Sequence, residues 1–160
     1  MGTVRHCGHP NDVTTFIFGP LNPPNNYPIL AYYEAKFRGD AGTFGIGLCD
    51  GALDRSDFVC WTPNSFGYES SGELLGFSAT GGPPVVHSHR FFPNDIVGCG
   101  MNLATREAIF TLNGQKINST GLRIGNGSNF PAVSMIGRGT SATVNFGPIW
   151  MFKLCKVFEP

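Results

Sequence analysis

The fold class is decided by the stretch Ala108-Ile109-Phe110-Thr111-Leu112-Asn113-Gly114-Gln115-Lys116-Ile117. Its β-branched and aromatic residues favour a strand, and the Asn-Gly pair tolerates the positive φ angles of a tight type I′ turn. Just upstream, Ile96-Val97-Gly98-Cys99-Gly100-Met101 is a nearly continuous apolar run, typical of a buried strand. The chain from 96 to 117 therefore predicts antiparallel strands that end in a hairpin.

A helix over residues 102–112 competes with this interpretation. Leu-Ala-Thr-Arg-Glu-Ala at 103–108 is rich in helix formers and lacks glycine and proline. The tail Ile109-Phe110-Thr111, closed by Asn-Gly, favours a strand, so we expect at most one helical turn before it.

Short apolar or alternating stretches separated by turn residues recur along the chain, as in sandwiches and barrels. In residues 31–37, alternation predicts that Tyr33, Ala35 and Phe37 share one face, with Tyr32, Glu34 and Lys36 on the other. The further strands that we expect are 3–7, 13–18, 43–48, 115–117, 130–135, 140–146 and 152–157. The predicted fold class is all-β.

Composition limits the class of protein. With 22 glycines and 12 prolines in 160 residues, the chain has little room for long helices, and 14 phenylalanines suffice for the core of one domain. Eleven Lys and Arg balance eleven Asp and Glu, so no net positive field favours nucleic acid. Neither a signal peptide nor an apolar run long enough to span a membrane is present in this chain.

Five cysteines, Cys7, Cys49, Cys60, Cys99 and Cys155, are widely spaced and form no CxxC pair. An odd number without paired spacing suits reduced, buried thiols better than a disulfide framework. We therefore expect a reducing, cytoplasmic location.

The motifs of enzymes are missing. Gly76-Phe77-Ser78-Ala79-Thr80 departs from the nucleophile elbow by one residue, and no phosphate-binding loop occurs. His6, Cys7, His9, His87 and His89 could supply metal ligands, but they lack the paired spacing of structural zinc sites and are interpreted as parts of two surface loops. Cys60 is interpreted as a packed thiol. We expect no enzyme, no metal and no cofactor.

Eight blocks in order, spread over about 3–152, resemble a SPRY domain. They are Tyr32-Tyr33-Glu34-Ala35, Gly45-Ile46-Gly47-Leu48, Trp61, Ser65-Phe66-Gly67-Tyr68, Asn94-Asp95-Ile96-Val97-Gly98-Cys99, Ile109-Phe110-Thr111-Leu112-Asn113-Gly114, Phe130-Pro131-Ala132-Val133 and Val144-Asn145-Phe146-Gly147. The length from Gly47 to the closing Trp61 is similar to the Ran-binding-protein (RanBPM-like) type. Residues 97–106 are similar to the secreted SPRY effectors of plant-parasitic nematodes.

The resemblance implies a single SPRY domain over 1–160, folded as a bent sandwich of two antiparallel sheets, without a catalytic centre. It also implies partner binding through loops at one edge. Position by position, the partner-binding residues would be Phe18, Pro20, Asn22, Tyr68, Met135, Ile136 and Gly137. Trp61 is a further candidate, and the alternative for it is a ring packed over the sheet edge. Relatives that grip peptides carry arginine in place of Phe18 and tryptophan near Ile136, which favours a more apolar epitope here.

The predicted function is that of a non-catalytic, monomeric module that binds a protein or short peptide, and neither nucleic acid nor a membrane. In its effector form the chain would be secreted and then act in host cytoplasm on immune or ubiquitin- and Ran-pathway proteins, its signal peptide being absent from this chain. The alternative is a lectin-like sandwich that binds a carbohydrate or other small molecule. With so few charges, we expect an affinity that varies little with salt.

Overall fold

β-Strands make up nearly all the regular structure of the residues that the structure describes. The computed structural model describes residues 1–21, 23, 30–62, 65–76, 86–118, 122–124, 130–154 and 156. The strands are β1 (Gly2–Arg5), β2 (Val13–Ile17), β3 (Leu30–Arg38), β4 (Thr43–Cys49), β5 (Ser65–Glu69), β6 (Glu73–Gly76), β7 (Val86–His87), β8 (Ile96–Asn102), β9 (Ala108–Leu112), β10 (Gln115–Ile117), β11 (Phe130–Ile136) and β12 (Ser141–Asn145).

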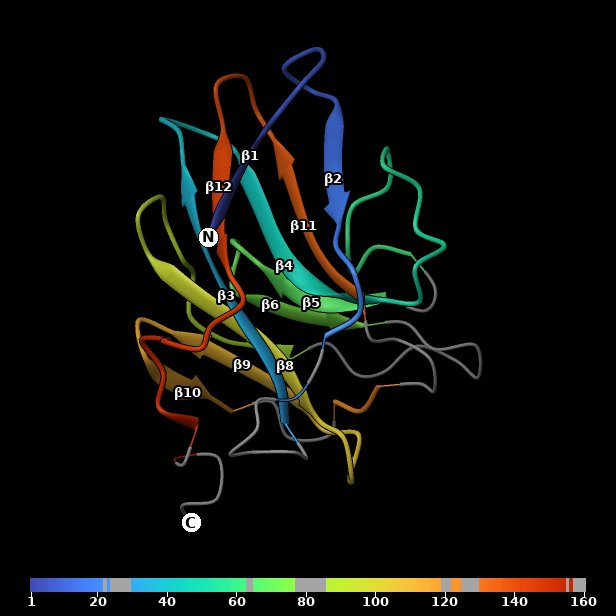
Figure 1. The fold of residues 1–160 in the computed structure, drawn as a ribbon. Helices are drawn as coiled ribbons and strands as arrows, with labels where there is room; N and C mark the ends of the chain where they lie inside the picture. The colour runs from blue at the N-terminus through green and yellow to red at the C-terminus, as the bar shows by residue number, and fades with distance from the viewer. Residues whose placement is uncertain are drawn as a thin grey trace.

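These strands form two six-stranded sheets, drawn in Figure 1. Sheet A has the order β1-β12-β3-β8-β9-β10, and sheet B has the order β2-β11-β4-β5-β6-β7. Every pairing is antiparallel. The expected sandwich of two antiparallel sheets is confirmed.

The β9–β10 hairpin forms where the sequence predicts it. Asn113 and Gly114 have φ angles of 48° and 78°, so both turn positions are left-handed, as a type I′ turn requires. Gln115 pairs with Leu112 across the turn. Residues 103–105 form a turn rather than a helix, so the strand prediction is right and the competing helix is wrong.

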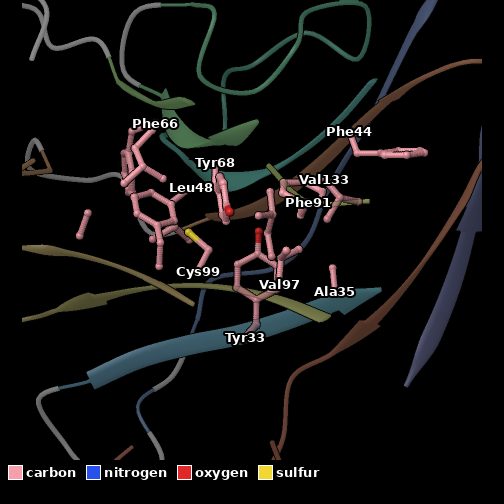
Figure 2. Close-up of a cluster of buried hydrophobic side chains, with 14 of the residues drawn as sticks. Tyr33, Ala35, Phe44, Leu48, Phe66, Tyr68, Phe91, Val97, Cys99 and Val133 are labelled. Carbon is pink, nitrogen blue, oxygen red and sulfur yellow. The ribbon is translucent and has the colours of Figure 1, made fainter. Parts of the chain in front are cut away.

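One apolar core fills the space between the sheets (Figure 2). In β3, Tyr33, Ala35 and Phe37 point inward as predicted, whereas Tyr32 packs in a separate cluster on the outer face of sheet A. Figure 2 shows residues of sheet A facing residues of sheet B, among them Tyr33, Val97, Cys99, Leu48, Phe66, Tyr68 and Val133. Burial of each large side chain stabilises the fold by about 1.5–3 kcal/mol.

The C-terminal segment covers the outer face of sheet A without joining it. Phe152 and Leu154 pack on Leu30, Tyr32 and Ile109. The expected strand over 152–157 is wrong for the described residues, 152–154 and 156, which are irregular or 3₁₀-helical. The Phe152 amide donates to a carboxylate of β3 rather than to a neighbouring strand.

Strands β5, β6 and β7 were not anticipated from the sequence. They contain five, four and two residues. Such short segments carry little periodic signal and are held by the hydrogen-bonded ladder with their neighbours, beginning with β4.

The cysteines of the described residues are free thiols. Cys49, Cys60 and Cys99 are buried as expected, and burial raises the pKa of each. Cys7 is exposed, so the expectation of a buried thiol is wrong there, because it lies in the loop beyond the edge strand β1. No helix in the described part of the chain is long and apolar enough to span a bilayer.

Candidate functional site

The outer face of sheet B is shaped by two glycines of β4. Because Phe44, Ile46 and Leu48 point into the core, Gly45 and Gly47 face outward. A Cβ atom on Gly45 would lie 2.5 Å from the Phe58 ring, and one on Gly47 would lie 2.7 Å from a Val59 methyl group. The absence of side chains thus lets the β4–β5 loop lie directly against the sheet.

A chain of buried hydroxyl groups fixes that loop. Thr15 donates from Oγ1 to the Asp57 carbonyl oxygen at 2.6 Å and lies 2.6 Å from Ser134 Oγ. Ser134 Oγ in turn accepts the Val59 amide at 2.8 Å. Since buried polar groups cost free energy unless they are paired, these bonds hold residues 57–59 in one position.

Trp61 is the exposed aromatic group of this loop. Its ring stacks on Phe58 with centroids 4.4 Å apart and planes 26° apart, and its Nε1–H donates to Glu69 Oε2 at 2.8 Å. The side chain is nevertheless 46% exposed. The preceding Cys60 has a φ of 74° and donates its amide to Ser65 Oγ at 2.9 Å. The ring is therefore held in place while much of it still faces solvent.

Ile136 lies on the same outer face, at the end of β11. It pairs with Val13 of β2 on one side and with Thr43 of β4 on the other, and all three are half-buried. Gly45, which lies under Phe58, follows two residues after Thr43, and Glu69 pairs with Gly45. The structure therefore places two predicted site residues, Trp61 and Ile136, on the same outer face of sheet B. We call Val13, Thr43, Trp61, Glu69 and Ile136 the Trp61–Ile136 surface.

Gly137 follows directly and turns the chain toward β12. Its φ is 133°, and a Cβ atom there would lie 2.8 Å from the Ala41 carbonyl oxygen. Thr140 closes the turn by donating from Oγ1 to the Gly137 carbonyl oxygen at 2.7 Å. The contribution of Gly137 is thus the shape of the β11–β12 turn beside Ile136.

Two predicted residues lie elsewhere. Phe18 is half-buried against Phe146, with ring centroids 5.2 Å apart, and Pro20 is exposed. They follow the end of β2 that is opposite to Val13, so about 16 Å of strand separates Phe18 from Val13. Asn22 lies outside the described residues.

The structure contradicts the prediction that Tyr68 and Met135 bind a partner. Both side chains are fully buried, so neither can contact a partner in this conformation. Tyr68 points into the core in Figure 2, packs edge-on against Phe91 and donates its hydroxyl to the His89 carbonyl oxygen. Alternation explains both cases, since each residue is next in sequence to one that faces outward, Glu69 and Ile136.

The fold agrees with one family. The sequence model described as the SPRY domain matches residues 30–149. The chain belongs to the SPRY family.

Curated relatives of this SPRY domain are much longer proteins. The Ran-binding protein M homolog of Arabidopsis thaliana is 31% identical over 129 residues, which are 79% of this chain and 27% of the relative. Ran-binding protein 9 of Xenopus tropicalis is 30% identical over 74% of this chain and 21% of its own length. The dual specificity protein kinase splA of Dictyostelium discoideum is 30% identical over 71% of this chain but only 5% of the kinase. The SPRY domain thus spans at most about a quarter of these relatives.

A solved structure shows the same fold. The crystal structure of a human SPRY domain superposes with a TM-score of 0.74 at 22% identity, over 92% of this chain and 93% of that one. The Ran-binding relatives support the RanBPM-like type inferred from the spacing of Gly47 and Trp61.

Glu69 and Phe58 both contact Trp61, and sequence reasoning missed them as candidate residues of this SPRY domain. Alternation through Ser65-Phe66-Gly67-Tyr68-Glu69 could have placed Glu69 on the outer face. No sequence signal placed Phe58 over Gly45, because that contact joins a loop to the middle of a strand.

The histidines of the SPRY domain lie in two separate regions: His6 and His9 are in the loop after β1, whereas His87 ends strand β7, so the loop interpretation is wrong for His87. His6 Nε2 lies 2.7 Å from the Asp12 carbonyl oxygen, and His87 Nδ1 lies 3.9 Å from Glu73 Oε1. Within the described ranges, no three His, Cys, Asp or Glu residues gather closely enough to hold a metal ion.

Proposed function

We propose that this SPRY domain binds a protein or peptide partner through the Trp61–Ile136 surface. SPRY domains are protein-interaction modules, and the observation that carries the location is the fixed but 46% exposed ring of Trp61. Exposed tryptophan is enriched at the centres of interfaces. A ring already held by Phe58 and Glu69 loses little conformational entropy when a partner covers it.

The neighbouring residues suit an interface as well. Ile136 and Val13 supply half-buried apolar area on the same face of sheet B as the indole, and Thr43 and Glu69 supply polar groups. An apolar centre with a polar border is the common composition of protein interfaces.

The test is affinity purification from cell extract with matched variants. Trp61→Ala and Ile136→Asp each alter the surface, and Phe92→Ala removes another exposed aromatic group, 58% exposed, from the β7–β8 loop. Partners captured by the wild-type chain and by Phe92→Ala should be lost with Trp61→Ala and Ile136→Asp. Equal capture by all four proteins would overturn the proposed surface.

The finer identity of the partner is a separate proposal. Relatives named Ran-binding proteins favour a partner in Ran-linked or ubiquitin-linked pathways. The similarity of residues 97–106 to secreted effectors extends this proposal to host immune proteins. Direct titration with purified Ran would test the Ran-linked partner, and capture from host cytosol with the Trp61→Ala control would test the host immune partner. The absence of binding in both assays would reject both partner proposals.

The oligomeric state and the compartment of the protein belong to the same proposal. We expect a monomer. We also expect a reducing compartment, since Cys49, Cys60 and Cys99 are buried free thiols. Light scattering under reducing conditions should give the mass of one chain, and a dimer mass would contradict the expectation.

A lectin-like function is the second candidate, and one feature favours it. A cleft between β7 and the β9–β10 hairpin is lined by hydrogen-bonding side chains, including His87, His89, Asn113, Gln115 and Lys116. Such groups can bind sugar hydroxyls. A glycan array hit that Gln115→Ala abolishes and Trp61→Ala leaves unchanged would support this candidate, and an empty array would reject it.

A further inference from the structure

The zero net charge of the chain conceals a separation of charge. Residues 39–89 carry six carboxylates and a single basic side chain, Arg55. The rest of the chain carries five carboxylates and ten Lys and Arg residues. Residues 39–89 form β4 to β7, four of the six strands of sheet B. Most of sheet B therefore comes from the acidic part of the chain, and Glu69 brings that charge to the Trp61 end of the Trp61–Ile136 surface, which suits a cationic group of a partner there.

Trp61 offers one face of its ring to solvent. Phe58 stacks on the other face, so the exposed part of the indole lies opposite Phe58 and along the ring edge. The negative face of an indole is the best aromatic site for a cation. Among the described residues the cation–aromatic contact is between Arg90 and Phe92, at 5.8 Å, which leaves the Trp61 ring without a cation from the part of the chain that the structure describes.

Glu69 places a carboxylate beside that ring. Its Oε2 accepts the indole Nε1–H at 2.8 Å, so the carboxylate is fixed at the ring edge rather than free to rotate away. Within the described residues the ion pair found is His87–Glu73, and Glu69 has no such partner. An aromatic face and a fixed carboxylate edge are the two groups that recognise a guanidinium, which is planar, stacks on rings and donates to carboxylates.

We propose that Trp61 and Glu69 form a receptor for an arginine side chain of the partner, which stacks on the indole and donates to the Glu69 carboxylate. The proposal rests on the proposed binding function and adds the chemistry of the partner. Ile136 and Val13 extend the same surface, so an apolar residue should accompany the arginine. The arginine proposal replaces the earlier expectation that the affinity for the partner varies little with salt, because a guanidinium–carboxylate contact weakens as salt screens it.

The test uses a random peptide display library selected on the wild-type chain, because it needs no known partner. Selected peptides are first sorted by their loss of binding to Trp61→Leu, which keeps apolar bulk but removes the aromatic face. Among these peptides we expect enrichment of arginine next to an apolar residue. Replacement of that arginine by citrulline, a neutral near-isostere, should weaken binding about tenfold, as expected for loss of a charge-assisted hydrogen bond.

The substitution Glu69→Gln in the protein should weaken the binding of the arginine peptides to a similar extent and reduce the salt dependence of their affinity. Asp50→Asn is the matched control: it removes one carboxylate from the same acidic segment, at the far end of β4, and keeps an oxygen that can accept the Ala52 amide. Trp61-dependent peptides that lack arginine, or that bind Glu69→Gln and wild type equally, would overturn this inference and leave the proposed function standing. A library that yields no Trp61-dependent peptide would overturn both.

Discussion

The Tyr33 hydroxyl of sheet A lies 2.6 Å from the carbonyl oxygen of Gly47 in sheet B. It also lies 2.9 Å from the Ala132 carbonyl oxygen and accepts the Gly47 amide at 3.2 Å. Gly47 and Ala132 face each other in the β4–β11 ladder, so one buried side chain joins the two sheets at a defined register. The strand held in this way is the one on which the β4–β5 loop rests.

Tyr33→Phe should destabilise the protein without changing its fold. The phenyl ring keeps its packing, but the two carbonyl oxygens and the amide lose a buried partner, which costs about 1–3 kcal/mol. In urea unfolding we expect a lower midpoint with an unchanged slope. An unchanged midpoint would show that the cross-sheet hydrogen bonds contribute nothing net.

Gly47→Ala should disturb both the core of sheet B and the loop that carries Trp61. The new Cβ atom would lie 2.1 Å from the Phe66 carbonyl oxygen, a backbone atom that cannot rotate away. We expect a loss of about 1–3 kcal/mol or more in the free energy of unfolding. Gly19→Ala, where no atom lies within 4 Å of the new Cβ, is the control and should be near neutral. Similar losses in both variants would contradict the steric explanation.

Glu34→Gln should release the C-terminal segment from sheet A. The buried carboxylate accepts the amides of Met151 and Phe152, each at 2.9 Å, and the Tyr32 hydroxyl at 3.0 Å. A neutral amide has one oxygen and weakens these bonds, at a cost of about 1–3 kcal/mol. Hydrogen exchange of the Met151 and Phe152 amides should accelerate, while that of Cys99 in the core should change less. Unchanged exchange at 151 and 152 would reject this role for Glu34.

Stability should fall at alkaline pH. Burial raises the pKa of Tyr32, Tyr33 and Tyr68 above the ordinary 10.0, and that of the thiols Cys60 and Cys99 above 9.0. The unfolded chain therefore loses these protons first, so this stability is complete below pH 9 and declines as pH rises from there toward the folded-state values. Urea midpoints measured from about pH 8 to about pH 11 should decrease, and Tyr33→Phe should flatten the decline above pH 10. A constant urea midpoint over that pH range would contradict the conclusion that these buried tyrosines and thiols have raised pKa values in the folded protein.

The sequence by itself determined the features that depend on neighbours along the chain. The β9–β10 turn follows from the φ angles that Asn113 and Gly114 tolerate, and the inward face of β3 follows from the two-residue period of a strand. The order of the SPRY blocks also lies in the sequence alone, and it indicated the family.

Only the tertiary structure decided which candidate residues face solvent and which are buried. Phe58 lies over Gly45, and the buried hydroxyls of Thr15 and Ser134, far apart in the sequence, meet beneath the loop. These contacts bring Trp61 to the same face as Ile136, while the sheet pairing turns Tyr68 into the core. The physical reason is that burial depends on which distant segment covers a face, and no local pattern specifies that segment.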